Sequence, residues 1–395
     1  MADKVIYLDN AATTRVSDGV LAAMLPYFGD TYGNPSSIYE FSMQSKKALV
    51  AAREEIAAAL NCEPSEIYFT SGGSEADNWA LYGTAEALRE KGRHIITTKV
   101  EHHAVLHACE WLEMKGWRVS YIGVDENGIV KLDELKRAVS SETVLISVMA
   151  ANNEIGTLQP VAQIGKFAKE RGICFHTDAV QAFGHIPMDV RAMNIDMLSA
   201  SGHKLNGPKG IGFLYVRQGT ALPSMIRGGG QERGRRAGTE NVPGIVGFGQ
   251  AVREAGAAMK ERAEYECALR DYFMDEVLRR IQYARVNGSR KDRLPNNVNF
   301  SFQFIEGESL LIMLDMQGIC ASSGSACTAG SLEPSHVLMS LGLPEEVVHG
   351  SIRFTLSRDT TKEEIDFVID RMEEIVAKLR EMSPFYSEVA GRIRR

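Results

Sequence analysis

The stretch Ser199-Ala-Ser-Gly-His-Lys-Leu-Asn-Gly-Pro-Lys-Gly210 lies between two apolar runs, residues 195–198 and 211–216. A short apolar run, a small polar turn and a second apolar run are typical of two strands joined by a tight connection. Lys204 lies in that connection among small residues, which let other groups approach the backbone closely. Between strands its amine would be partly desolvated, and the lowered pKa would make it nucleophilic. Two interpretations follow: a lysine that forms a Schiff base, or a surface lysine in a hairpin.

Short apolar runs alternate with helical patterns on the N-terminal side of this stretch, from Glu66 onward. This alternation predicts an α/β fold with a doubly wound, mostly parallel sheet, which binds ligands beyond the carboxyl ends of its strands. The residues after 70, 99, 149, 176 and 199 are therefore expected to form functional loops. We expect strands at 67–70, 94–97, 117–122, 143–149, 173–176 and 197–200, and helices at 17–27, 37–60, from 74, from about 104, at 132–139 and at 161–170. Ser37 and Glu40 have the spacing of a capping box at the start of one helix.

The second part of the chain has a different pattern. A long helix is predicted from Pro243 to about Ile281, followed by strands at 298–302, 318–320 and 351–356 and helices at 308–316 and 362–382. We therefore expect two domains. A large domain would cover 15–255, and a small α+β domain would combine 1–14 with 256–395.

Composition narrows the possible partners. The 395 residues carry a net charge of −7, which argues against nucleic acid, and no apolar run approaches the ~18 residues that span a bilayer. The N-terminus shows no signal-peptide pattern. The cysteines are scattered without a Cys-x-x-Cys pair, which is typical of reduced thiols in a cytoplasmic protein. They are Cys62, Cys109, Cys174, Cys267, Cys320 and Cys327.

Asp178 follows the apolar run 173–175, where an unpaired carboxylate is costly. A helix cap would account for it. A pyridinium N–H would also keep it ionised, and such an ion pair lets the ring act as an electron sink. Gln181, three residues later, is placed to reach the same ring. Asp178 and Lys204 together therefore favour a site for pyridoxal phosphate.

Three other loops have both a functional and a structural interpretation. Gly73 and Ser74 begin a helix, where they would hold a phosphate or simply cap the helix. Asn152 and Asn153 would orient a ligand's carboxylate or form a turn. In the third loop, residues 101–107, one histidine is suited to cover a flat ligand. That histidine is His102, whereas His103 and His107 have the spacing of a metal pair. No third ligand is apparent, so no resident metal is expected.

Two distinctive segments lie nearer the C-terminus. Gly228-Gly-Gly-Gln-Glu-Arg-Gly-Arg-Arg-Ala-Gly-Thr239 contains three arginines, and a salt-bridged loop or a phosphate contact is favoured over a nucleic-acid patch. Cys327 lies in Ala321-Ser-Ser-Gly-Ser-Ala-Cys-Thr-Ala-Gly-Ser331, which has too little apolar surface to bury a thiol. We therefore expect an exposed, mobile loop whose thiol approaches a bound substrate.

The motifs in these segments resemble those of the NifS/IscS-like cysteine desulfurases, which belong to aminotransferase class V among the fold-type-I pyridoxal-phosphate enzymes. They are Tyr7-Leu-Asp-Asn-Ala-Ala-Thr-Thr14, Ser-Gly-His-Lys204, Arg-Arg-Ala-Gly-Thr239-Glu-Asn, Ser-Ser-Gly-Ser-Ala-Cys327-Thr and Ser351-Ile-Arg-Phe354. The resemblance implies a large seven-stranded cofactor domain and a small C-terminal domain that carries Cys327. It also implies a homodimer that converts L-cysteine to L-alanine and passes sulfur, as a Cys327 persulfide, to an acceptor such as an iron–sulfur scaffold.

The resemblance also implies roles for individual residues. Lys204 would bind pyridoxal phosphate covalently and move protons, Asp178 would pair with the pyridine nitrogen, and Gln181 with the phenolic oxygen. His102 would be a catalytic residue stacked on the ring. The phosphate would be bound by Gly73, Ser74, Ser201 and His203, and Thr239 would bind the phosphate of the partner subunit. Asn153 would contact cofactor and substrate, and Arg353 would bind the substrate carboxylate. Cys327 would be the sulfur nucleophile, and its transient ligation of an iron–sulfur cluster is left open.

The chain departs from the family pattern at two places, Gly73-Ser74, where Ala-Thr is frequent, and Ala329-Gly330, where a serine is common. Three alternatives also stay open. A class V aminotransferase would share the cofactor residues without needing Cys327, and a selenocysteine lyase would be closer still. A non-catalytic sulfur-carrier scaffold would not need Lys204, Asp178 and Arg353.

Overall fold

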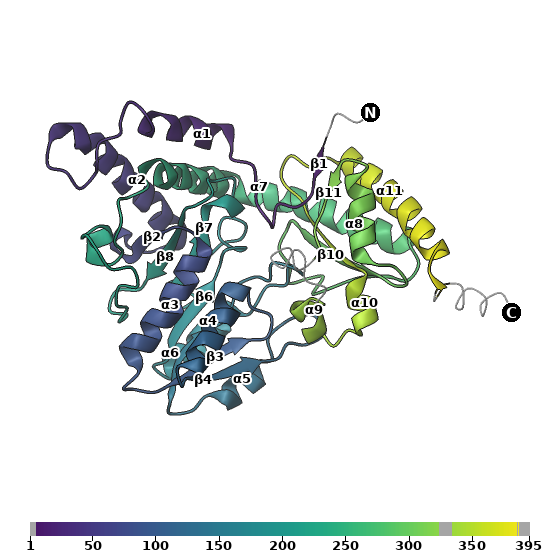
Figure 1. Ribbon diagram of the computed structural model, residues 1–395, viewed down its shortest axis with the longest axis horizontal. Coiled ribbons are helices and arrows are strands. Elements are labelled where there is room, and N and C mark those ends of the chain that lie inside the picture. Colours follow the sequence, from purple (N-terminus) through teal and green to yellow (C-terminus); the bar gives the residue numbers. More distant parts are fainter. Residues whose placement is uncertain (1–4, 324–333, 385, 387–395) are drawn as a thin grey trace.

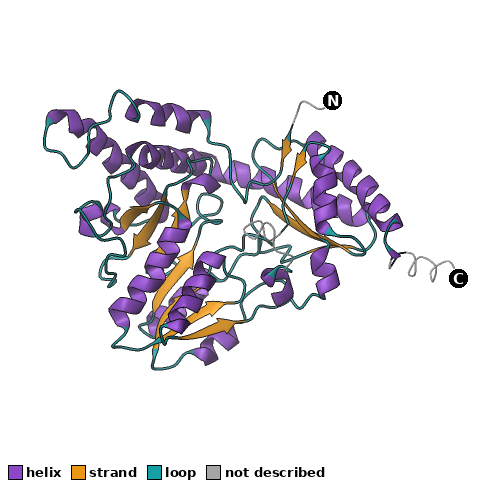
Figure 2. Cartoon of the chain, viewed as in Figure 1, coloured by secondary structure: helices purple, strands orange, loops and turns teal. Residues whose placement is uncertain are grey.

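The computed structural model describes residues 5–323, 334–384 and 386, which form two units joined by one long helix (Figures 1 and 2). The helices are α1 (Asp18–Met24), α2 (Met43–Leu60), α3 (Gly73–Leu88), α4 (His103–Met114), α5 (Leu132–Ala138), α6 (Val161–Glu170), α7 (Val242–Arg280), α8 (Gly307–Asp315), α9 (His336–Ser340), α10 (Glu345–His349) and α11 (Lys362–Glu381). The strands are β1 (Ile6–Tyr7), β2 (Ile67–Thr70), β3 (His94–Thr98), β4 (Arg118–Ile122), β5 (Thr143–Ser147), β6 (Cys174–Asp178), β7 (Met197–Ser201), β8 (Gly212–Val216), β9 (Ala284–Val286), β10 (Asn297–Phe302), β11 (Ile319–Cys320) and β12 (Ser351–Thr355).

The larger unit is built on a seven-stranded sheet in the order β2-β8-β7-β6-β5-β3-β4. Only β8 runs antiparallel to its neighbours in this sheet, and the other strands are parallel. The mostly parallel α/β sheet predicted from the sequence is confirmed. Because β3, β5, β6 and β7 point the same way, the loops after all four meet at one edge of the sheet.

Both faces of this sheet are buried, because alternate side chains along each strand enter different cores. On β8, Leu214 packs with Trp79 of α3 and Val105 of α4, whereas Phe213 packs with Phe248 of α7 on the other face. Helices α2 and α6 also cover that second face. This two-sided covering is the doubly wound arrangement expected from the alternating pattern.

The smaller unit contains an antiparallel sheet in the order β12-β10-β9 and a two-stranded parallel pair, β1-β11. Helices α8 and α11 pack with the second half of α7 around it (Figure 1). Phe273 of α7 contacts Phe300 of β10 and Phe354 of β12 edge-on, with ring centroids 5.3 and 5.2 Å apart. Helix α7 therefore contributes to both cores, and the domain boundary between 255 and 256 stays a prediction.

The predicted capping box of Ser37 and Glu40 is wrong. Helix α2 begins at Met43, and residues 40–42 form a single 3₁₀ turn before it. The Ser42 hydroxyl donates to the carbonyls of Ser37 and Tyr39, at 2.8 and 2.6 Å. Tyr39 is extended, so the chain at 37–39 cannot continue the helix toward its N-terminus. The sequence also missed β9, α9 and α10, which are too short to show a period.

Candidate active site

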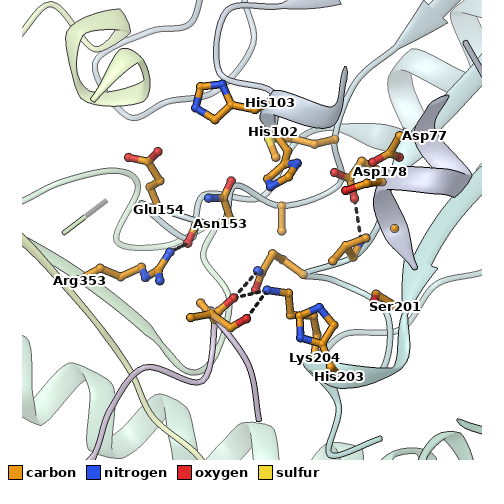
Figure 3. Close-up of a pocket in the computed structure, with 18 of the residues that line it drawn as sticks. Asp77, His102, His103, Asn153, Glu154, Asp178, Ser201, His203, Lys204 and Arg353 are labelled. Atoms are coloured by element: carbon orange, nitrogen blue, oxygen red, sulfur yellow. Dashed lines mark hydrogen bonds between the residues drawn. The ribbon is translucent and has the colours of Figure 1, made fainter. Parts of the chain in front are cut away.

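A cavity of about 390 Å³ lies at the carboxyl edge of the large sheet, where the smaller unit meets it (Figure 3). Its wall includes residues that follow β3, β5, β6 and β7, together with the N-terminal segment and Arg353 of β12. Of the residues expected from the sequence, the structure brings Gly73, Ser74, His102, Asn153, Asp178, Gln181, Ser201, His203, Lys204 and Arg353 into this wall.

Lys204 ends the 3₁₀ turn that follows β7, and β7 pairs with β8 as the predicted strand, turn and strand. Its Nζ donates to the backbone carbonyls of Ala11 and Ala12, at 2.5 and 2.9 Å. The structure thus places Lys204 in the cavity wall and not at the tip of a solvent-exposed hairpin. The two alanines belong to the motif of residues 7–14, but no role was predicted for them from the sequence.

Asp178 ends β6 and is 5% exposed. Its Oδ1 accepts a hydrogen bond from the Val180 amide at 2.9 Å. Burial raises the pKa of Asp178 to about 6, although the Val180 N–H and the charge of Lys204 act in the opposite direction. A cationic N–H donor in the cavity would favour the ionised carboxylate still further.

Asp77 of α3 also lines the cavity, and the sequence did not point to it. Its Oδ1 is buried without a hydrogen-bond partner and lies 3.6 Å from Nε2 of His176. Burial, followed by the charge of Asp178, raises the pKa of Asp77 well above its ordinary value. Burial also lowers the pKa of His176 to about 3. Asp77 and Asp178 thus form a pair of buried carboxyl groups at this end of the cavity, and the charge of Asp178 makes ionisation of Asp77 less favourable.

His102 is the N-cap of α4, and its Nδ1 accepts a hydrogen bond from the Ala104 amide at 3.1 Å. This bond fixes the ring in the cavity wall. Burial, followed by the charge of Lys204, lowers the pKa of His102 to about 4.

On another side of the cavity, Gln181 Nε2 donates to the Ala11 carbonyl at 3.0 Å.

The N-terminus of α3 is suited to an anion. No side chain caps this helix, and its first residues, Gly73 and Ser74, line the cavity together with Ser201 and His203. Unpaired amides at the start of a helix attract negative charge. The space beside Gly72 is open, because a Cβ added there would have Ser201 Oγ, at 3.9 Å, as its nearest neighbour. The residues and the available space thus fit a phosphate group.

Arg353 lies at another part of the wall and is 2% exposed. Its Nη1 donates to the Asn153 carbonyl at 3.0 Å and its Nη2 to Asp9 Oδ1 at 2.9 Å. A guanidinium has five N–H groups, so donors remain for a carboxylate ligand.

The two adjacent asparagines have different roles. Asn152 forms the turn, because its Oδ1 accepts from the amides of Glu154 and Ile155, whereas Asn153 lines the cavity. The sequence had left two interpretations open for this pair, a turn or a contact with a ligand. The turn applies to Asn152, and Asn153 is the one placed to contact a ligand.

One predicted site residue in the described part of the chain, Thr239, does not line this cavity. Thr239 lines a smaller pocket beside Ser71 and Arg236, and Arg236 makes two bonds to the Glu75 carboxylate, at 2.8 and 3.0 Å. An ion pair therefore holds the arginine-rich loop, in agreement with the salt-bridged loop that was one of the two favoured interpretations. Cys327 lies outside the described residues.

Three histidines lie close together at another side of the cavity, and two of them, His103 and His336, line its wall. The His103 ring lies 5.0 Å from the ring of His107 and 4.8 Å from that of His336, measured between centroids. Over residues 5–323 and 334–384, however, no three His, Cys, Asp or Glu side chains converge as a metal site would require. Along the same ranges, no helix is long and apolar enough to cross a membrane.

The arrangement as a whole combines an amine, a buried carboxylate, an anion site and a guanidinium around one cavity. These are the groups needed to hold a phosphorylated pyridine aldehyde together with an amino-acid carboxylate. The donor set of the chain therefore fits pyridoxal phosphate.

Comparison with known proteins gives a consistent result. The aminotransferase class V family matches residues 6–368. The chain is 55% identical over 382 residues to a protein named cysteine desulfurase IscS from Methanosarcina thermophila, which covers 97% of this chain and 94% of that protein. The solved structure of a NifS-like protein superposes with a TM-score of 0.90 at 39% identity, covering 95% of this chain and 100% of that one. A solved structure described as SspA in complex with cysteine superposes with a TM-score of 0.79 at 39% identity, covering 90% of this chain and 100% of that one.

The stability of the cofactor-free protein should depend on pH through Asp178. The ordinary pKa of this group is 3.8, whereas the folded chain raises it to about 6. The folded state thus holds the proton more tightly, and the stability that this proton contributes is complete below about pH 4 and is lost as the pH rises through 6. Relative to the wild type, the free energy of unfolding of Asp178→Asn should rise on the order of 2 kcal/mol between pH 4 and pH 7.

Urea unfolding of the two cofactor-free proteins across this pH range measures the difference directly. Comparing the two proteins cancels the titration of buried groups that do not interact with Asp178, whereas Asp77 and Glu101 feel its charge. A difference that stays constant from pH 4 to pH 7 would contradict the assignment of the raised pKa to Asp178.

Proposed function

The chain belongs to the aminotransferase class V family and is a pyridoxal-phosphate-dependent cysteine desulfurase, and on that premise we propose how its residues divide the work. One observation carries the proposal. A single cavity combines the Lys204 amine and the Asp178 carboxylate with an anion site at the N-terminus of α3 and the guanidinium of Arg353.

The cofactor would be held by residues around the whole cavity. Ser74, Ser201, His203 and the first amides of α3 would bind its phosphate, Asp178 its ring nitrogen and Gln181 its phenolic oxygen. His102 would lie against the ring, with its imidazole held by the Ala104 amide. When bound, pyridoxal phosphate supplies an aldehyde carbon for covalent attachment to an amine and a ring that accepts the electrons released at the substrate Cα. Asp178 supports this chemistry by keeping the proton on the ring nitrogen.

L-cysteine would be positioned by its carboxylate. Arg353 binds this group with the donors that Asp9 and the Asn153 carbonyl do not use, and the Asn153 side chain contributes a polar contact. Lys204 is the base that takes the Cα proton and later returns a proton. Its position above the carbonyls of Ala11 and Ala12 directs the amine into the cavity.

Cys327 would receive the sulfur. Its thiolate attacks the sulfur of the bound L-cysteine, so an S–S bond forms as the C–S bond breaks, and L-alanine leaves after protonation. The residues that flank this segment support the proposal. Ser322 exchanges backbone hydrogen bonds with Arg353 at 2.6 and 3.1 Å, and the Ser335 hydroxyl donates to Glu154 at 2.5 Å. Cys327 follows Ser323 by four positions, which span at most about 14 Å, so the thiol is tethered next to the strand that carries Arg353.

The persulfide would then pass its sulfur to an acceptor protein such as an iron–sulfur scaffold, in the cytoplasm. The cysteines at 62, 109, 174, 267 and 320 are free thiols in the described part of the chain, which supports a reducing compartment. Burial raises the pKa of Cys62 to about 12 and also raises that of Cys320, so neither is a competing thiolate at neutral pH.

A homodimer would complete the site. Large apolar side chains of the N-terminal segment are exposed, and they would be covered by a second copy of the chain. They include Leu25, Phe28, Tyr32, Ile38 and Tyr39, which are 55–99% exposed. Thr239 lies outside the cavity of its own chain, which supports a role at the phosphate of the partner subunit.

Covalent labelling tests the role of Lys204. Borohydride reduction of the holoenzyme should leave the cofactor's mass on the peptide that contains Lys204, as read by mass spectrometry. Lys204→Ala should give no such peptide and should lose the visible absorbance of the bound cofactor. Labelling of a different lysine in the wild type would reject Lys204.

The variant Cys327→Ser tests the sulfur acceptor. A hydroxyl cannot replace the thiolate as a nucleophile toward sulfur, so alanine formation from L-cysteine should fall at least ~100-fold, while cofactor binding stays normal. Cys320→Ser is the matched control and should retain activity. Sustained alanine release by Cys327→Ser would show that another group receives the sulfur, whereas an amino-acceptor requirement would indicate an aminotransferase.

The substitution Ile38→Glu tests the homodimer. Ile38 is 99% exposed in a single chain, so a charge there should cost nothing in a monomer but would be buried in a dimer interface. We expect sedimentation velocity to show a dimer for the wild type and a weakened dimer for Ile38→Glu, with Met114→Glu unchanged. Met114 is 76% exposed and lies on α4. A wild-type monomer would contradict the proposal.

A further inference from the structure

Glu154 is a buried acid for which the mechanism above has no use. It is 2% exposed and lines the cavity next to Asn153 and Arg353 (Figure 3). Burial raises its pKa, while the Ser335 hydroxyl and the charges of His336 and Arg353 act in the opposite direction. A buried carboxyl group is costly, so its partners indicate what it does.

The backbone of Glu154 is held from several sides. Its amide donates to Asn152 Oδ1 at 2.9 Å, and its carbonyl accepts from the side-chain amides of Asn297 and Asn299, at 3.3 and 3.1 Å. These bonds join the loop after β5 to β10 of the smaller unit. The carboxyl group therefore extends from a fixed backbone.

The carboxyl group of Glu154 contacts the start of α9. Its Oε2 accepts from the Ser335 hydroxyl at 2.5 Å, a separation typical of an O–H donor bound to a carboxylate. The same hydroxyl oxygen accepts from the Leu338 amide at 3.2 Å and so caps α9. The capping bond uses the oxygen of Ser335 and the bond to Glu154 uses its hydrogen, so the two contacts can be separated by mutation.

A second bond holds α9 to the large unit. His336 Nε2 donates to the Glu101 carbonyl at 3.0 Å, and Glu101 directly precedes His102. Val337 and Leu338 also pack in one apolar cluster with Ile155. The start of α9 is thus attached to the loops that carry Asn153 and His102, which are proposed to contact substrate and cofactor.

From these contacts we infer that Glu154 is a positioning residue that holds the start of α9, which follows the Cys327 segment in the sequence, in a fixed relation to the substrate carboxylate site. The inference rests on the proposed role of Cys327 as sulfur acceptor. The hydrogen bond of the Glu154 carboxyl group is to Ser335 at the start of α9, whereas proton transfer at Cα is assigned to Lys204. Its contribution is therefore to the transfer of sulfur and not to the earlier steps at Cα.

The holoenzyme provides the test, by rapid mixing with L-cysteine and two readouts. The absorbance change of the bound cofactor reports the arrival of substrate, and mass spectrometry of quenched samples reports the persulfide on Cys327. Glu154→Ala should leave the rate of the absorbance change within about threefold of the wild type. It should slow persulfide formation on Cys327 about tenfold or more, because a hydrogen bond to a charged group is lost. Glu154→Gln keeps an acceptor oxygen and should restore most of the rate of persulfide formation.

Ser340→Ala is the matched control, since its hydroxyl donates within α9, to the His336 carbonyl at 2.7 Å, and not to Glu154. It should leave both rates unchanged. If Glu154→Ala does not fold, Ser335→Asp takes its place. An aspartate there keeps a capping oxygen but repels Glu154, so the same split is expected.

Equal slowing of both readouts, or slowing of neither, would overturn the inference. Failure of Glu154→Gln to restore the second rate would overturn it as well. A wild-type enzyme that forms no persulfide on Cys327 would instead overturn the proposed function, so the two failures can be distinguished.

Discussion

The parallel direction of β3, β5, β6 and β7 is the constraint on which the site depends. Parallel neighbours place their carboxyl ends at one edge, so His102, Asn153, Asp178 and Lys204 meet there although about a hundred residues separate the first from the last. The antiparallel β8 adds a second effect. Because it pairs directly with β7, the connection between them is short, and Lys204 is held close to the sheet.

Several buried carboxyl groups lie in the cavity wall or directly next to a residue of that wall. Burial raises the pKa of Asp77, Glu101, Asp178 and Glu154 above their ordinary values, and that of Glu101 rises to about 8. Such groups are weak contributors to stability and are costly when unpaired. A bound ring nitrogen and an amino-acid substrate would supply positive charge beside Asp178. The folded chain thus carries an electrostatic cost that ligands relieve, which is typical of a functional site.

The N-terminal segment and strand β12 close the cavity from the side of the smaller unit. The N-terminal segment supplies the carbonyls that accept from Lys204, and β12 supplies Arg353. These two segments are themselves joined, because the Ala11 amide donates to Thr355 Oγ1 at 2.8 Å and Arg353 pairs with Asp9. Helix α7 holds the smaller unit in place through its contributions to both cores. This side of the cavity therefore depends on contacts between residues 344 positions apart.

The sequence by itself determined the α/β alternation, the long helix α7 and the loops after the strands, because a buried parallel strand needs an apolar run and a ligand-binding loop needs small or polar residues directly after it. Ser201, His203 and Arg353 were expected at the cavity only through the resemblance to the cysteine desulfurases. The sequence could not determine that Ala11 and Ala12 accept from Lys204, that Asn152 forms the turn while Asn153 lines the cavity, or that Glu154 meets Ser335. Those contacts join residues far apart in the chain, or distinguish neighbours of the same type, and no local pattern records them. Only the tertiary structure decided them, because a hydrogen bond depends on the distance and direction between two groups once both cores have packed.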